Sequence, residues 1–202
     1  LRESLDERPE EVDLVIALAA LEEAQGDLAA AEELLRRAVE VEPGNAEGWF
    51  RLGVVLDKQG RREDGLVYMR KAIELDDRHA RALNYVGYTM VEEGRSLDEA
   101  ERLIRRALAV EPYSSYILDS LGWVYFQRGQ YREALTYLKR AAAAGDSDPV
   151  IYEHLGDTHL KLGQPAEAAE AYRRALALEP AEDQKLRQKL RSAQEKLPPA
   201  ER

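Results

Sequence analysis

The sequence predicts an all-α fold in which antiparallel helix pairs stack into a solenoid. The first observation behind this prediction is a set of five similar segments, each ending in glycine, that recur along most of the 202-residue chain. The closing glycines, which are separated by 34, 34, 35 and 34 residues, are Gly26, Gly60, Gly94, Gly129 and Gly163. A fixed period of this size is typical of repeat proteins with one helical hairpin per repeat.

A second pattern with the same period follows each glycine. A small residue is followed by a large apolar residue four positions later and by an alanine after three more, as in Ala134, Leu138 and Ala141. Apolar residues at helical spacing on both sides of the glycine predict two helices per repeat. Helix-breaking or capping residues near the repeat ends interrupt the helical pattern: these are Pro43, Asp77, Pro112, Asp146 and Pro180.

These two patterns predict the order and the bounds of the elements along the chain. Residues 1–11 are expected to be the second helix of a preceding, truncated repeat, because Pro9 stands where a repeat-closing proline belongs. Five complete repeats are predicted at residues 12–45, 46–79, 80–114, 115–148 and 149–182. Residues 183–197 are expected to form the polar-backed helix that closes a solenoid, followed by a tail, 198–202. The apolar face of that helix holds Leu186, Leu190, Ala193 and Leu197.

Two local features refine the predicted helix pairs. Small residues, such as Gly53 with Ala72, are expected to let the two helices of a repeat approach closely. The third repeat is one residue longer than the others, and the extra residue falls in the stretch GRSLDEAERL. There Ser96 and Glu99 have the spacing of a capping box, which predicts the start of the second helix.

The repeat resembles the tetratricopeptide repeat family, whose pattern is W..LG..Y, A...F..A, P. The second repeat carries this pattern as Trp49, Leu52, Gly53, Gly65, Met69 and Ala72. Gly65 in place of alanine, and Asp77 and Asp146 in place of proline, are mild departures. The resemblance implies a right-handed superhelix of antiparallel helix pairs that binds other proteins. The later repeats are also similar to those of large bacterial multi-repeat proteins, some of them outer-membrane lipoproteins that serve as adaptors.

The resemblance also implies a binding groove. In the family, four positions of each first helix line a concave surface, and their spacing forms one stripe per helix. On this basis the candidate partner-binding residues are Phe50, Arg81, Asn84, Tyr88, Tyr116, Asp119, Trp123, Phe126, Glu153 and Asp157. Exposed aromatic side chains are typical anchors of protein interfaces, so the aromatic members predict a site for a peptide or helix. The alternative is that these rings pack against neighbouring first helices and form the bottom of the groove without binding a partner.

The charges around the rings suggest the kind of partner. Carboxylates on the stripe favour an apolar protein or peptide segment with basic residues. A subgroup of the family clamps C-terminal carboxylates with basic side chains and asparagines, but only Arg81 and Asn84 on the stripe suit that role. The alternative function is self-association, in which an open end of the solenoid or the groove accepts a second copy.

Composition narrows the functional classes. The net charge of −10 argues against broad nucleic-acid binding, which needs a basic surface. The acidity lies in residues 1–48, with 14 acidic against 4 basic residues, whereas the rest of the chain holds 25 of each. The absence of cysteine excludes disulfides and cysteine-based metal sites. No apolar run is long enough to span a membrane, and bacterial cytoplasm, periplasm and an outer-membrane lipoprotein all stay open.

The three histidines predict neither a metal site nor catalysis. His154 and His159 are five residues apart and so do not share a helix face. His159 takes a packing position that the family usually gives to tyrosine, which favours a core histidine, and His79 is expected to be exposed at a repeat junction. Without a phosphate loop, a nucleophile motif or a metal motif, the sequence predicts a binding module with no enzymatic activity, cofactor or metal.

Overall fold

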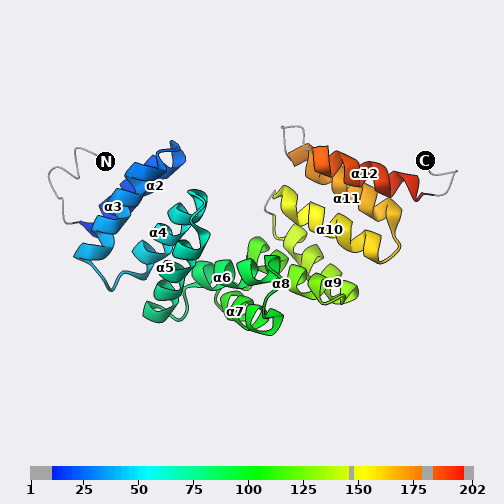
Figure 1. The fold of residues 1–202 in the computed structure, drawn as a ribbon. Helices are drawn as coiled ribbons and strands as arrows, with labels where there is room; N and C mark the ends of the chain where they lie inside the picture. Colours follow the sequence, from blue (N-terminus) through cyan, green and yellow to red (C-terminus); the bar gives the residue numbers. More distant parts are fainter. Residues whose placement is uncertain (1–10, 146–147, 179–183, 198–202) are drawn as a thin grey trace. The chain divides into compact units, whose positions relative to one another are not determined.

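The computed structural model describes residues 11–145, 148–178 and 184–197, and these residues form eleven α-helices without a strand (Figure 1). The helices are α2 (Val12–Ala24), α3 (Leu28–Val41), α4 (Ala46–Lys58), α5 (Arg62–Leu75), α6 (Ala80–Glu92), α7 (Leu97–Val110), α8 (Ser115–Gln127), α9 (Tyr131–Ala143), α10 (Pro149–Lys161), α11 (Pro165–Leu178) and α12 (Gln184–Glu195). The predicted truncated helix, residues 1–11, and tail, 198–202, fall almost entirely outside the described residues.

The helices group into two compact units, Leu1–Val86 and Gly87–Arg202, which are considered separately below. Within the first unit, α2 packs on α3 and α4 on α5, and α3 also contacts α4. Within the second, α8 packs on α9 and α10 on α11, while α9 and α8 both contact α10. The predicted all-α class and its antiparallel helix pairs are therefore confirmed, whereas the exact division into five repeats stays a prediction.

Each first helix ends where the sequence places its closing glycine. The five glycines have φ between 64° and 85°, a left-handed conformation that costs glycine little because it has no β-carbon. In α4, for example, the helix ends at Lys58 and the Gly60 amide donates to the Asp57 carbonyl at 2.8 Å. The glycine period thus sets the length of the first helices.

Close approach within a helix pair depends on small residues. The residue facing Gly53 across the pair is Gly65, not Ala72 as expected, because a β-carbon built on Gly53 would lie 2.7 Å from the Gly65 carbonyl oxygen. In the fourth repeat, a β-carbon on Gly122 would lie 2.7 Å from Leu138 Cγ. The backbones therefore approach at the first, small residue of the second-helix pattern, such as Gly65, and not at the alanine seven residues later, such as Ala72.

The predicted capping box in the third repeat is wrong. Ser96 adopts a left-handed conformation, with φ 46° and ψ 51°, and its side chain makes no capping hydrogen bond. The Ser96 carbonyl accepts a 2.8 Å hydrogen bond from the Glu99 amide instead. Ser96 lies in the loop that is one residue longer in this repeat, and its left-handed backbone differs from the extended backbone that a capping residue usually has.

Helix α12 packs on α11 through the apolar face that the sequence indicated. Leu186 and Ala193 are buried in a cluster that includes Tyr172, and Leu190 packs against it. Burial of such a face is the main source of stability for a short helix. The role of α12 as the closing helix of a solenoid stays a prediction. None of the described helices is both long and apolar enough to cross a membrane.

Candidate partner-binding site

Three stacked rings from α8 and α10 form what we call the aromatic platform: Trp123, Phe126 and His154. The Trp123 ring lies parallel to the Phe126 ring, with centroids 4.4 Å apart and an interplanar angle of 9°. It also lies parallel to the His154 ring at 3.9 Å and 12°. Trp123 and Phe126 stay partly exposed, whereas His154 is buried. Rings therefore cover both faces of Trp123, and the parts of the platform open to solvent are the edge of Trp123 and part of Phe126.

The support of the platform is a buried pair of polar groups. His154 Nδ1 lies 2.9 Å and 3.0 Å from the two carboxylate oxygens of Asp119, and both side chains are buried. Since a carboxylate accepts hydrogen bonds, Nδ1 is the donor, which fixes the plane of the imidazole on which Trp123 stacks. Asp119 was expected to contact a partner; its burial gives it no surface to offer.

No binding role was predicted for His154, although the sequence contains a signal for one. Asp119 is the fifth residue of α8 and His154 the sixth of α10, and the two helices begin 34 residues apart. In a repeat protein, nearly equivalent positions of consecutive first helices lie side by side. A histidine and a carboxylate at such positions could have been recognised as a pair.

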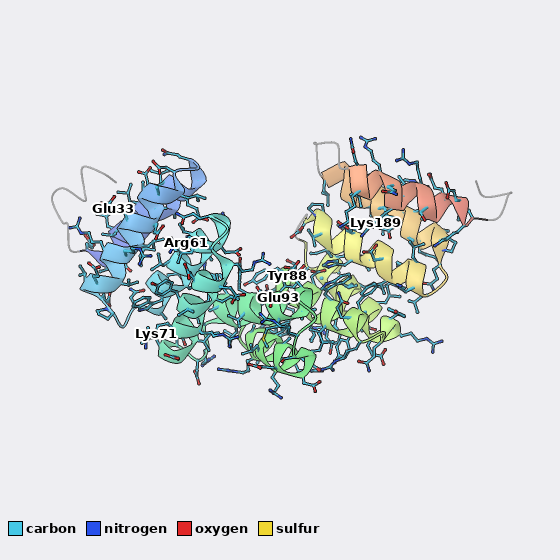
Figure 2. The ribbon with its side chains drawn as sticks, in the orientation of Figure 1. Glu33, Arg61, Lys71, Tyr88, Glu93 and Lys189 are labelled. Atoms are coloured by element: carbon cyan, nitrogen blue, oxygen red, sulfur yellow. The ribbon has the colours of Figure 1, made fainter. Side chains whose placement is uncertain are left out.

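Two further candidate residues of the same unit are tyrosines, one exposed and one partly buried. Tyr116 is 37% exposed, and its hydroxyl donates to Glu111 at 3.0 Å. Tyr88, labelled in Figure 2, lies on α6 and is partly buried. Burial raises the pKa of the Tyr88 hydroxyl, and the carboxylates of Glu92 and Asp119 raise it further. Tyr88 therefore keeps its proton at neutral pH and can donate a hydrogen bond.

The two remaining acidic candidates are held by a lysine. Lys189 of α12, labelled in Figure 2, places Nζ 2.6 Å from Glu153 Oε1 and 2.6 Å from Asp157 Oδ2. Asp157 also accepts a 2.7 Å hydrogen bond from the Tyr172 hydroxyl. Lys189 thus supplies one positive charge to two carboxylates inside the unit, and Tyr172 adds a neutral hydrogen-bond donor.

The pKa directions agree with this arrangement. Burial on its own would raise the pKa of Glu153, but the hydrogen bond and charge of Lys189 lower it below its usual range. Burial would lower the pKa of Lys189, but its hydrogen bonds with Asp157 and Glu153 raise it. Each group therefore holds its partner in the charged form.

We expect Lys189→Met to lower the free energy of unfolding by about 1–2 kcal/mol at pH 7, because it leaves two partly buried carboxylates without their cation. The Glu153 contribution is present above its ordinary pKa of about 4.3 and is lost as the pH falls, and the Lys189 contribution is present below about 10.4 and is lost as the pH rises. Urea denaturation should therefore show the largest difference from wild type between about pH 5 and 10.

Lys185→Met is the matched control for this prediction. Lys185 is on the same helix, but its side chain is 76% exposed and its Nζ lies 3.6 Å from Glu153. We expect this control to change stability by less than about 0.5 kcal/mol, as is usual for an exposed ion pair. Equal effects of the two substitutions, or a Lys189→Met effect that does not depend on pH, would contradict the assignment.

One candidate of the first unit, Arg81, belongs to a charged cluster around Glu47. Glu47 accepts hydrogen bonds from Arg51 at 2.6 Å and from Arg81, and His79 Nε2 lies 3.3 Å away. Burial would raise the pKa of Glu47, but these partners lower it to about 2. The His79 side chain is only 9% exposed and its ring lies 4.9 Å from the Phe50 ring, so the expectation of an exposed His79 was wrong.

Of the three candidates in this unit, only Arg81 offers an exposed side chain. Its guanidinium lies 5.1 Å from the centroid of the Phe50 ring, which is itself buried. Asn84 is also buried, and its Oδ1 has no hydrogen-bond partner among the described residues. The partly exposed aromatic residues among the candidates thus all lie in the unit Gly87–Arg202.

The described residues include no cluster of three or more histidine, aspartate or glutamate side chains placed to hold a metal ion.

Comparison with protein families gives two matches. A tetratricopeptide repeat model matches residues 120–183, and the model of the cilia and flagella-associated protein 70 middle TPR-like domain matches residues 16–129.

Curated relatives are similar over part of their length. TPR repeat-containing protein PA4667 of Pseudomonas aeruginosa is 28% identical over 140 residues, which are 69% of this chain and 18% of that protein. The type IV pilus assembly protein PilF of the same organism is 28% identical over 117 residues, which are 57% of this chain and 46% of PilF. The chain thus spans less than half the length of either relative.

Solved structures are similar in fold. A structure of Pseudomonas aeruginosa PilF superposes with a TM-score of 0.75 at 23% identity and covers 92% of this chain and 90% of that one. The APC/C hetero-tetramer Cut9–Hcn1 gives a TM-score of 0.86 at 16% identity over 96% of this chain and 38% of the other. At these identities the similarity concerns the fold alone.

Proposed function

The chain belongs to the tetratricopeptide repeat family, whose members act as protein-interaction scaffolds, and we propose that it is an adaptor whose aromatic platform binds an apolar peptide or helix of a partner protein. The observation that carries this proposal is the pair of partly exposed rings, Trp123 and Phe126, stacked on the buried His154. Tryptophan and tyrosine dominate the binding energy of many protein interfaces.

Rigidity of the platform supports this function. Trp123 is stacked on His154, His154 is held by Asp119, and Phe126 meets the Tyr131 ring edge-on at 5.4 Å. Side chains that are already ordered lose little conformational entropy when a partner binds, so more of the contact energy appears as affinity. A surface with mobile rings would lose part of that energy.

The chemistry of the partner follows from what surrounds the platform. Asp119 is buried and paired with His154, and Lys189 bridges Glu153 and Asp157, so all three carboxylates already make hydrogen bonds inside the unit, although one lysine does not offset two carboxylates. We therefore propose an apolar partner segment whose rings supply most of the affinity, with basic residues as a smaller contribution favoured by the remaining negative charge. A stable interface buries roughly 800 Å² on each partner, which is more than two rings supply. Tyr88 and Tyr116 are the residues we expect to supply part of the remainder.

The experiment that tests this proposal is selection of a random peptide display library on the wild-type chain, with counter-selection on the double variant Trp123→Ala/Phe126→Ala. The proposed function predicts enriched peptides that are apolar and that bind the wild type but not the double variant. The proposal fails if the enriched peptides bind both proteins equally, or if they are uniformly acidic or basic. Circular dichroism of the double variant provides the control for folding.

The alternative occupant of the platform is a second copy of the chain. Light scattering over a concentration series of the wild type and the double variant distinguishes it from a foreign partner. A molar mass that rises with concentration only in the wild type would assign the platform to self-association. A constant monomer mass together with peptide binding supports the adaptor function.

A further inference from the structure

A cavity of about 650 Å³ lies between α9, α10 and α11 in the unit Gly87–Arg202. Tyr152 and Leu155 of α10 and Ala171 of α11 form apolar parts of its wall, and Lys139 of α9 lies at its edge. No residue of the aromatic platform lines this cavity. A volume of this size is in the usual range of ligand pockets. The cavity is therefore a candidate site of its own.

The preceding repeat explains why the cavity exists. There, Tyr125 of α8 and Tyr137 of α9 stack in parallel, with centroids 5.4 Å apart and an angle of 10°. The residues 34 positions later, at the equivalent places of α10 and α11, are His159 and Ala171. Both of them line the cavity. The cavity thus occupies the place that two tyrosine rings fill one repeat earlier.

The polar groups around the cavity also have counterparts 34 positions earlier, in the preceding repeat. In the preceding repeat the Tyr125 hydroxyl accepts a 2.5 Å hydrogen bond from Arg105 and donates one of 3.0 Å to Glu101. The residue 34 positions after Arg105 is Lys139, which lines the cavity and makes no hydrogen bond or ion pair with any described residue. A cation is thus in position to donate to a phenol oxygen that the chain itself does not supply.

His159 provides the complementary acceptor. Its Nδ1 lies 2.7 Å from the side-chain oxygen of Gln164, and because an amide oxygen only accepts, Nδ1 carries the proton. The Nε2 atom of the neutral ring is then an acceptor, and it has no hydrogen-bond partner among the described residues. His159 is only 8% exposed and lines the cavity. This nitrogen is not among the buried side-chain atoms that lack a partner, so it is open to the cavity, where a hydroxyl group can donate to it in place of water.

We propose that this cavity binds a tyrosine side chain presented by a partner protein. The ring fills the space left by His159 and Ala171, and the hydroxyl donates to His159 Nε2 and accepts from Lys139. The charged residues of the lining, two basic and two acidic, balance one another, which favours a neutral occupant: they are Lys139, Glu167, Glu170 and Arg174. The volume exceeds that of one phenol ring and leaves room for the residues that flank a tyrosine in a peptide.

The probes for this site are N-acetyl-tyrosinamide and N-acetyl-phenylalaninamide, titrated into the whole chain and followed by NMR. We expect the tyrosine probe to shift the signals of Ala171 and Leu155 and to bind about fivefold more tightly than the phenylalanine probe, since one net hydrogen bond contributes that much. Equal affinities, or shifts confined to other residues, would overturn the proposal. If p-cresol binds and the tyrosine probe does not, the cavity binds a free phenol rather than a tyrosine side chain of a protein, and the proposal fails.

Variants separate this site from the aromatic platform. The double substitution His159→Tyr/Ala171→Tyr fills the cavity with the chain's own rings and should abolish binding of the tyrosine probe without loss of helical circular dichroism. Lys139→Met, at an exposed position, should remove most of the preference for tyrosine over phenylalanine even if the double variant does not fold. Trp123→Ala should leave probe binding unchanged. Undiminished binding to the folded double variant, or an undiminished preference in Lys139→Met, would contradict the proposal.

Discussion

Replacing Gly65 by alanine is expected to lower the free energy of unfolding by about 2 kcal/mol, although alanine is the better helix former by about 1 kcal/mol. A β-carbon on Gly65 would lie 2.5 Å from the Gly53 carbonyl oxygen and 3.4 Å from the Asp57 amide nitrogen. Both are backbone atoms, so α4 and α5 would have to move apart and loosen the packing of the fully buried Met69. Urea denaturation followed by circular dichroism measures the change.

Gly48→Ala is the matched control for the Gly65 substitution. Gly48 is also helical and buried and lies in the same unit, but the nearest atom to its β-carbon would be Val39 Cγ1 at 3.2 Å, which belongs to a side chain. The small crowding and the gain in helix propensity should nearly cancel, leaving a change within about 0.5 kcal/mol. A Gly65→Ala variant as stable as wild type or as Gly48→Ala would contradict the close backbone approach of α4 and α5.

Trp123→Ala is expected to weaken binding of a library-selected peptide by at least about 30-fold, which corresponds to about 2 kcal/mol. The substitution removes the largest exposed ring of the platform, and it also removes the contact surface on which both Phe126 and His154 stack. Phe126 then loses its fixed orientation as well. Isothermal titration calorimetry of the peptide against wild type and variant measures the loss.

Tyr113→Ala is the control for the loss of an aromatic ring. Tyr113 lies in the same unit and is 84% exposed, but it makes no contact with the platform rings. We expect peptide affinity to stay within twofold of wild type, since an isolated exposed ring outside the interface contributes about nothing to binding. Equal losses in the two variants would place the peptide elsewhere, and an unchanged affinity of Trp123→Ala would remove the platform from the binding site.

Much of the fold could be predicted from the sequence because the repeat period is a strong and redundant signal. Each closing glycine takes the left-handed conformation that ends a first helix, so the positions of the first helices follow from the glycines alone. The insertion was placed in the stretch GRSLDEAERL, but the capping role expected of Ser96 there was wrong. A capping pattern depends on backbone angles, and an insertion changes those angles without changing the pattern.

The candidate site was predicted less completely because its properties depend on contacts between repeats. Trp123 and Phe126 were identified from their positions on a helix stripe. Neutralisation of Glu153 by Lys189 joins residues 36 positions apart on different helices, and no single-repeat pattern contains it. The burial of Asp119 and its pairing with His154 depend in the same way on how α8 packs against α10.

The fluorescence of Trp123 tests the central claim most directly. In a Trp49→Phe background Trp123 is the only tryptophan of the chain, since the sequence contains two. If the platform is the binding surface, its emission should change on titration with a selected peptide and saturate with the dissociation constant found by calorimetry. Emission that stays constant while calorimetry reports binding would show that the partner binds away from Trp123 and would contradict the proposed function.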